Sequence, residues 1–168
     1  MLSKIYGEAM CIHSDLPYTI FRPHNIYGPR MGMSHVIPEK LNEINSKNSG
    51  EIIHVASSKQ TRCFCFIEDA VKLLLKILEN DNCVNQTLNI GVSEPEISIG
   101  KLVEICCRVV GKDMILRGVE DTLGSPDRRS PDMNLTNKLV GKIKKTNLEQ
   151  GIKKTFEWYK DNYFKNLI

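Results

Sequence analysis

The sequence of 168 residues predicts an α/β fold, and three observations carry this prediction. Short runs rich in β-branched and aromatic residues alternate with longer segments whose apolar residues recur at three- and four-residue steps. Glycines and prolines separate these segments, as expected for turns. The composition, with 41% hydrophobic and 26% charged residues, is that of a globular chain able to bury one core. Strands that alternate with helices in this way are typical of an α/β fold.

The first elements are a helix, a strand and a loop. We predict the helix over residues 2–14, because the chain turns at Asp15-Leu16-Pro17. The β-rich run 18–21 follows and leads into the segment 22–30, whose two prolines and one glycine exclude a regular helix. Two further elements are predicted before residue 60, a helix that has Pro38 in its first turn and runs to about Ser46, and a strand over residues 52–55.

The clearest helix is predicted over residues 67–80, where apolar residues form a single stripe. Its members are Ile67, Ala70, Val71, Leu74, Leu75 and Leu78. Ser98 is a suitable N-cap and Gly111 a suitable C-cap for another helix that runs through Val110. The remaining predicted elements are a strand over residues 88–90 and helices over residues 136–141 and 147–163.

Charge and hydropathy exclude several classes of function. Lys and Arg number 23 and Asp and Glu 20, so the net charge of +3 lacks the strongly basic balance of a nucleic-acid-binding protein. The lysines near the C-terminus alternate with apolar residues at helical steps, which favours a solvated helix face. No apolar run approaches the roughly 20 residues that span a bilayer, and the first residues do not resemble a signal peptide. We therefore expect a cytoplasmic protein that binds neither nucleic acid nor membrane.

The six cysteines predict buried, reduced thiols rather than a disulfide framework or a zinc site. No Cys-x-x-Cys pair occurs, and Cys106 and Cys107 are adjacent. Cys63 and Cys65 on one strand face are an alternative pair of metal ligands or redox thiols, but small core residues are commoner. We predict no metal site.

Five motifs, in order along the chain, give a resemblance to a known family. They are Ser3-Lys4-x-x-Gly7-Glu8, Phe21-Arg22-Pro23-His24-Asn25-Ile26-Tyr27-Gly28-Pro29-Arg30, Gln60-Thr61-Arg62-Cys63-Phe64, Leu88-Asn89-Ile90-Gly91 and Arg128-Arg129-Ser130-Pro131-Asp132. This series resembles the extended short-chain dehydrogenase/reductases, specifically their NAD-dependent nucleotide-sugar epimerases and dehydratases. The resemblance covers nearly the whole chain but only the C-terminal half of a family member.

The resemblance implies a partial Rossmann-type parallel sheet plus a smaller α/β substrate-binding domain. Residues 1–30 would end the NAD-binding domain with the catalytic-lysine helix and its following strand. Residues 31–168 would form mainly the substrate-binding domain, with 67–91 returning to the Rossmann sheet. The family's Tyr-x-x-x-Lys pair would place its tyrosine four residues before Lys4, and the sequence contains no Gly-x-Gly-x-x-Gly turn for the NAD pyrophosphate. We therefore expect the isolated chain to be inactive.

The resemblance also assigns roles to nine residues. Lys4 would bind the nicotinamide ribose and lower the pKa of the catalytic tyrosine, and Pro23 and His24 would border the nicotinamide. Asn25 would donate an amide hydrogen bond to the sugar nucleotide, and His35 and Val36 would occupy the next substrate-contact position. Arg62 and Arg129 would bind the diphosphate, and Asp132 the nucleoside ribose.

Each of these residues also has a purely structural interpretation. A lysine on a helix face is usually solvated, and a single arginine usually makes a surface ion pair of little energetic worth. Asn25 and Asp132 are common turn residues, and His35 is nearly as well explained as a surface histidine. The sequence also departs from the family pattern at Cys63, where the family usually has Asp, and at Ala56 and Ser58, where it usually has glycines.

The function that the resemblance implies is NAD-dependent epimerisation of a nucleotide-diphosphate sugar at C4, by a parent protein that forms a homodimer. A nucleotide-sugar dehydratase and a uronic acid decarboxylase of the same family are alternatives. A non-catalytic module that binds sugar nucleotides is a third, from a different class of function.

Overall fold

The computed structural model describes residues 2–121 and 123–164. Its helices are α1 (Leu2–Ile12), α2 (Val36–Ser46), α3 (Ile67–Leu78), the 3-10 turn η1 (Asp81–Cys83), α4 (Ile99–Val110), α5 (Asn134–Val140) and α6 (Leu148–Asn162). Its strands are β1 (Thr19–Pro23), β2 (Ile26–Tyr27), β3 (Ile52–Ala56), β4 (Thr61–Cys63), β5 (Cys65–Phe66), β6 (Gln86–Ile90), β7 (Glu96–Ser98), β8 (Ile115–Val119) and β9 (Arg128–Arg129). Helices and strands alternate, so the predicted α/β fold class is confirmed.

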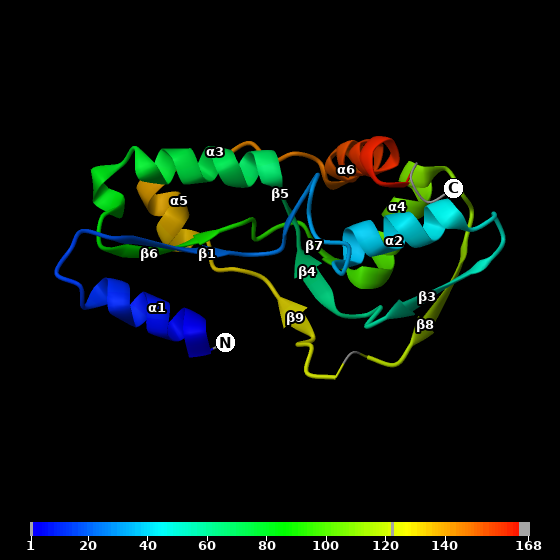
Figure 1. Ribbon diagram of the computed structural model, residues 1–168, viewed down its shortest axis with the longest axis horizontal. Coiled ribbons are helices and arrows are strands. Elements are labelled where there is room, and N and C mark those ends of the chain that lie inside the picture. Colours follow the sequence, from blue (N-terminus) through cyan, green and yellow to red (C-terminus); the bar gives the residue numbers. More distant parts are fainter. Residues whose placement is uncertain (1, 122, 165–168) are drawn as a thin grey trace.

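One part of the molecule is a parallel pair of strands between helices. Strands β1 and β6 pair in parallel, in a register that runs from Thr19 opposite Gln86 to Pro23 opposite Ile90. Helices α3 and α5 cover one face of this pair and α1 lies on the other (Figure 1). The core beneath α3 and α5 contains Ala70, Leu73, Ile77, Cys83, Leu88, Ile90, Val92 and Met133, together with Cys63 and Cys65. This arrangement is the partial Rossmann-type sheet that the resemblance implied.

A second part packs three helices against another parallel pair. Strands β3 and β8 pair in parallel, and α2, α4 and α6 pack against one another beside them (Figure 1). In β3, Ile53 and Val55 are buried and their neighbours are more exposed, which is the alternation of a strand with one face on the core. The core here includes Leu41, Ile44, Leu102, Val103, Ile152 and Tyr159.

Short strands connect the two parts. In a three-stranded sheet, β4 pairs antiparallel with β7 on one side and parallel with β9 on the other. Strand β2 pairs in parallel with β5. Cys63 of β4 contributes to the core beneath α3, whereas Tyr27 and Phe66 of β2 and β5 belong to the core beside α4 and α6. These strands therefore lie at the junction of the two cores.

The helix predictions hold where side chains carry clear signals. Ser98 Oγ accepts a hydrogen bond from the Lys101 amide at the start of α4, and Gly111 ends the helix with φ at 78°.

Among the described residues, no helix combines the length and the apolar character needed to cross a bilayer. Five of the six cysteines are buried and Cys11 is exposed, so the predicted burial of most thiols is confirmed.

Several predicted boundaries are wrong. Strand β1 continues through Arg22 and Pro23, which the sequence placed in the loop. The strand tolerates Pro23 at its end because successive amides of a strand point to opposite sides, and the bond to β6 comes from the next residue, whose amide (His24) donates to the Ile90 carbonyl. The helices predicted over 2–14, 67–80, 136–141 and 147–163 have the bounds of α1, α3, α5 and α6 given above, whereas α2 has Pro38 in its first turn and ends at Ser46 as predicted. Strands β2, β4, β5, β7, β8 and β9 were not predicted.

Candidate functional site

Four segments that are far apart in the sequence meet where β1 and β6 end. Residues 23–25 span the end of β1 and residues 89–93 span the end of β6, and the two strands run in parallel, so both segments lie at the same edge. Residues 62–65 of β4 and β5 lie beside them, and residues 129–132 follow from β9 (Figure 1). The carboxyl ends of parallel strands are the usual place for ligand sites in α/β proteins.

Asn25 links the first of these segments to β4 and β5. Its backbone has φ at 43°, a left-handed conformation that Asn adopts more readily than most residues. Its side-chain amide donates to the Cys63 carbonyl at 3.1 Å, and its own carbonyl accepts from the Cys65 amide at 3.1 Å. The Asn25 amide that was predicted to bind a sugar nucleotide therefore holds the β4–β5 junction in this structure.

The structure brings Arg62 and Arg129 together. They are register partners in the parallel pair of β4 and β9, so their side chains leave the sheet on the same face. Arg62 is 7% exposed, whereas Arg129 is exposed. Burial and, after it, the positive charge of Arg129 lower the pKa of the Arg62 guanidinium, and Asp127 opposes this effect. Two like charges at this edge of the sheet form a local excess of positive charge that an anionic ligand would relieve.

Cys63 ties three of the four segments together, a role that the sequence did not reveal. Its side chain is 1% exposed, and its single S–H has two acceptors within reach, the Ser93 carbonyl at 3.2 Å and Ser130 Oγ at 3.3 Å. The thiol therefore connects β4 to the segment after β6 and to the residue after β9. In the sequence, Cys63 stands out only because the family usually has Asp at this position. That difference did not indicate which residues the thiol contacts.

His24 and Asp132 join the same network through Asn89. The His24 Nε2 atom lies 3.0 Å from Asn89 Oδ1, and Asn89 Nδ2 donates to the Asp132 carbonyl at 2.7 Å. The Asp132 carboxylate accepts a hydrogen bond from the Asn134 amide at the start of α5, at 2.8 Å. The side chain of Asp132 is exposed, and its binding to a ribose stays a prediction.

Lys4 lies on α1, which buries none of its residues. An ion pair between Glu8 and Arg22, with 2.5 Å between Oε2 and Nη2, holds α1 against β1. The Arg22 guanidinium lowers the pKa of the Glu8 carboxyl, mainly through this hydrogen bond. Helix α1 runs antiparallel to β1 (Figure 1), so the first turn of α1, which carries Lys4, lies toward the end of β1 at Pro23.

His35 and Val36 lie at the start of α2, away from this network. His35 is the exposed N-cap residue of α2, and its carbonyl accepts from the Glu39 amide at 3.0 Å. Val36 packs against the core beside α4 and α6. Within residues 2–121 and 123–164, no hydrogen bond joins either residue to the arginine pair. Their predicted contact with substrate stays a prediction.

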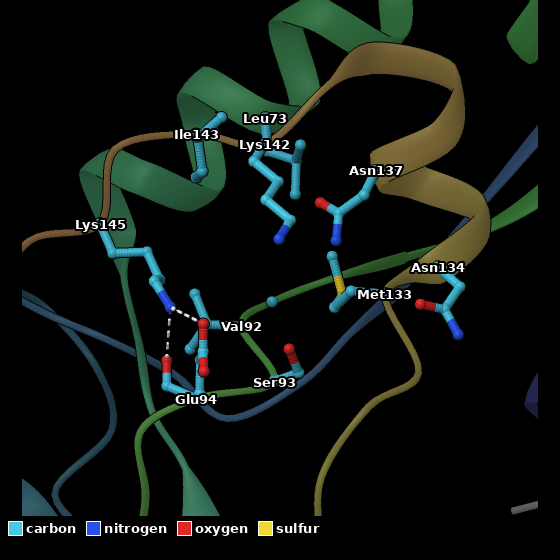
Figure 2. Close-up of a pocket in the computed structure, with 11 residues that line it drawn as sticks. Leu73, Val92, Ser93, Glu94, Met133, Asn134, Asn137, Lys142, Ile143 and Lys145 are labelled. Carbon is cyan, nitrogen blue, oxygen red and sulfur yellow. Dashed lines mark hydrogen bonds and ion pairs between the residues drawn. The ribbon is translucent and has the colours of Figure 1, made fainter.

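A cavity of about 200 Å³ lies close to this network but is lined by none of the nine predicted residues. It opens between α3 and α5, where Leu73, Val92 and Met133 form its apolar part and the Lys142 ammonium points into it (Figure 2). Lys145 at its rim donates to the carboxylate and the carbonyl of Glu94. In the part of the chain that the structure describes, no group of three or more His, Cys, Asp or Glu side chains is placed to hold a metal ion.

Comparison with known proteins places the chain in a family. Residues 1–91 match the NAD dependent epimerase/dehydratase family. A GDP-L-fucose synthase of Sinorhizobium fredii is 34% identical over an alignment of 177 residues. This alignment covers 98% of this chain and 55% of that protein. UDP-glucuronic acid decarboxylase 6 of Arabidopsis thaliana is 31% identical over 161 residues, which cover 88% of this chain and 45% of that protein.

Solved structures agree on the fold. The UDP-glucuronic acid 4-epimerase of Bacillus cereus superposes with a TM-score of 0.83 at 22% identity, over 96% of this chain and 52% of that one. The UDP-glucose 4-epimerase of Thermotoga maritima superposes with a TM-score of 0.79 at 23% identity, over 94% of this chain and 50% of that one. The chain belongs to the NAD-dependent epimerase/dehydratase family, and it spans about half the length of the curated relatives it matches.

The family depends on NAD, and the residues of this chain fit one part of that cofactor. Pro23 ends β1 and His24 follows it, and together with Lys4 of α1 they would border the nicotinamide. The sequence contains no glycine-rich turn of the kind that binds the pyrophosphate of a dinucleotide. That these residues bind the nicotinamide end of NAD stays a prediction.

Proposed function

We propose that this chain forms the substrate-binding half of an NAD-dependent enzyme that acts on a nucleotide-diphosphate sugar, and that the reaction is 4-epimerisation. The single observation that carries the proposal is the pair of arginines, Arg62 and Arg129, opposite each other on β4 and β9. Guanidinium groups bind phosphate oxygens through paired, charge-assisted hydrogen bonds, and a diphosphate brings two negative charges to such a site.

The surrounding residues support a ligand that is longer than a phosphate. Asn25 bonds to the Cys63 carbonyl at the end of β4, His24 precedes it in the chain, and Asp132 follows three residues after Arg129 of β9. A diphosphate at the arginines would therefore have a sugar toward the end of β1 and a nucleoside toward the Asp132 carboxylate. Named relatives include proteins that act on UDP-linked and GDP-linked sugars, which supports the same class of ligand.

The chemical step depends on the cofactor end of the site. In such an enzyme, bound NAD would supply the hydride acceptor and donor for the sugar. The contribution proposed for this chain is the Lys4 ammonium, whose positive charge favours the phenolate form of a nearby tyrosine and so assists proton exchange with a sugar hydroxyl. The family's catalytic tyrosine and the pyrophosphate-binding turn are not in this sequence. We therefore propose that the isolated chain binds the nucleotide but does not catalyse the reaction. A homodimer stays a prediction.

The test is calorimetric titration of the chain with UDP, GDP and uridine. We expect a nucleoside diphosphate to bind and uridine to bind far more weakly, and Arg129→Ala to weaken the binding at least about tenfold, as for loss of a charge-assisted hydrogen bond. Arg128→Ala is the matched control, because that neighbouring guanidinium is already paired with Glu96 at 2.8 Å. Equal effects of the two substitutions, or no binding of either diphosphate, would contradict the proposal.

A further inference from the structure

We propose that the cavity between α3 and α5 binds a small carboxylate that carries one apolar ring or branched chain. The cavity has a volume of about 200 Å³ and is lined by none of the residues assigned to the sugar nucleotide or to NAD. It lies on the face of the β1–β6 pair that α3 and α5 cover, whereas α1 with Lys4 lies on the other face (Figure 1). The site is therefore separate from the proposed function and can be tested without it.

The first step is that one side of the cavity is apolar and belongs to the core. Leu73 is 1% exposed, Met133 5% and Val92 7%, and all three are members of the core beneath α3 and α5. Ile143, from the segment between α5 and α6, packs against the same core. An apolar cavity of about 150 Å³ is large enough to hold benzene. The volume here therefore accommodates one aromatic ring or branched chain with a polar group attached.

The second step is that positive charge exceeds negative charge around the cavity. Within the described residues, the ionised side chains that line it are Lys142, Lys145 and Glu94. The Lys145 ammonium lies 3.1 Å from the Glu94 carboxylate, and this hydrogen bond is the main reason that the pKa of Glu94 is lowered. The charge of Lys142 contributes to the same shift, but in the described part of the chain its ammonium makes neither a hydrogen bond nor an ion pair. One cation is thus left for an anionic ligand to pair with.

The third step is that the polar groups without partners face the apolar side. Figure 2 shows the Lys142 ammonium and the Asn137 amide both directed into the cavity. Among the residues that the structure describes, none forms a hydrogen bond with the Asn137 side chain. A carboxylate accepts hydrogen bonds from an ammonium and from an amide N–H, and its apolar substituent would pack on Leu73 and Met133. Phosphate fits less well, because its polar oxygens on every side would lie against buried apolar side chains.

The experiment titrates the chain with benzoate, benzamide, acetate and inorganic phosphate, and follows the methyl signals of Leu73, Val92 and Met133 by NMR. Benzamide keeps the ring without the charge, whereas acetate keeps the charge without the ring. We expect benzoate to shift these signals with a dissociation constant of about 1 mM. We expect the other three compounds to bind at least about tenfold more weakly. Equal binding of benzamide would indicate a merely apolar void, and equal binding of acetate or phosphate a merely cationic surface, so either result would overturn the proposal.

Lys142→Met removes the charge and keeps an unbranched side chain, and we expect it to weaken benzoate binding at least about tenfold. Lys144→Met is the matched control, because this exposed lysine is close in sequence but does not line the cavity. Equal effects of the two substitutions would contradict the proposal, as would the absence of saturable shifts at about 10 mM benzoate. We also expect benzoate not to displace UDP; displacement would mean that the cavity is part of the nucleotide site. A chain that binds benzoate but neither UDP nor GDP would refute the proposed function and leave this site standing.

Discussion

Replacing Asn25 by alanine tests whether the site is built on a strained turn. The substitution removes the hydrogen bond to the Cys63 carbonyl and places a Cβ residue at φ 43° without a polar side chain that eases this conformation. The lost bond costs about 1 kcal/mol. The left-handed backbone costs about 1 kcal/mol more for alanine. We therefore expect Asn25→Ala to lower the free energy of unfolding by about 2 kcal/mol.

Asn25→Gly is the matched control, because glycine adopts the left-handed conformation freely but still lacks the amide. We expect it to lose about 1 kcal/mol, which is the hydrogen-bond part alone. Urea unfolding followed by circular dichroism and by the fluorescence of the single tryptophan, Trp158, measures both values. If both variants lose the same free energy of unfolding, backbone strain at residue 25 does not contribute to the effect of Asn25→Ala. A loss below about 0.5 kcal/mol in both would refute the whole account of Asn25.

Two further predictions concern packing and the thiols. A Cβ at Gly151 would lie 2.9 Å from Tyr27 Cζ and 3.1 Å from Phe66 Cδ2, in the buried core, so Gly151→Ala should lower stability by about 1–3 kcal/mol. Gly7→Ala on α1, where the new Cβ meets nothing within 4 Å, should instead raise it by about 1 kcal/mol, and thermal denaturation distinguishes the two. Burial raises the pKa of Cys65 and Cys106 to about 12, and the reactive thiolate forms only as pH rises toward that value. A thiol reagent at pH 8 should therefore modify one cysteine quickly, the exposed Cys11, and all six in denaturant; several fast thiols in the native chain would contradict this.

The elements that sequence reasoning identified are those with local signals. Helix α3 has an apolar stripe that repeats with the helix period, and α4 has a polar N-cap and a glycine C-cap. Such signals lie within the element itself. The short strands β4 and β9 have none, because Arg62 and Arg129 are paired across 67 positions of sequence and neither strand exceeds three residues. Long-range pairing of this kind depends on the whole fold.

The same distinction applies to the candidate site. The sequence motifs identify the two arginines, Asn25 and Asp132. They do not show which atoms these side chains bind. The Asn25 amide bonds to a backbone carbonyl, and the Arg62 fork bonds to Gln60 and Ser125. Ser125 lies outside every motif quoted for the family resemblance, so no sequence signal marked it. Partners that come from distant segments can be found only once the chain is folded.

Stability and binding must be measured on the same variants, because the site shares its residues with the junction between the two cores. A domain of this kind is stable by at least about 5 kcal/mol, so a loss of about 2 kcal/mol leaves about 99% of the molecules folded. Loss of folded protein cannot then weaken diphosphate binding tenfold. If Asn25→Ala has that effect while remaining folded, the change acts through the position of β4, since the Asn25 amide holds the Cys63 carbonyl and Cys63 follows Arg62. If Asn25→Gly binds normally, the left-handed turn rather than the amide sets that position.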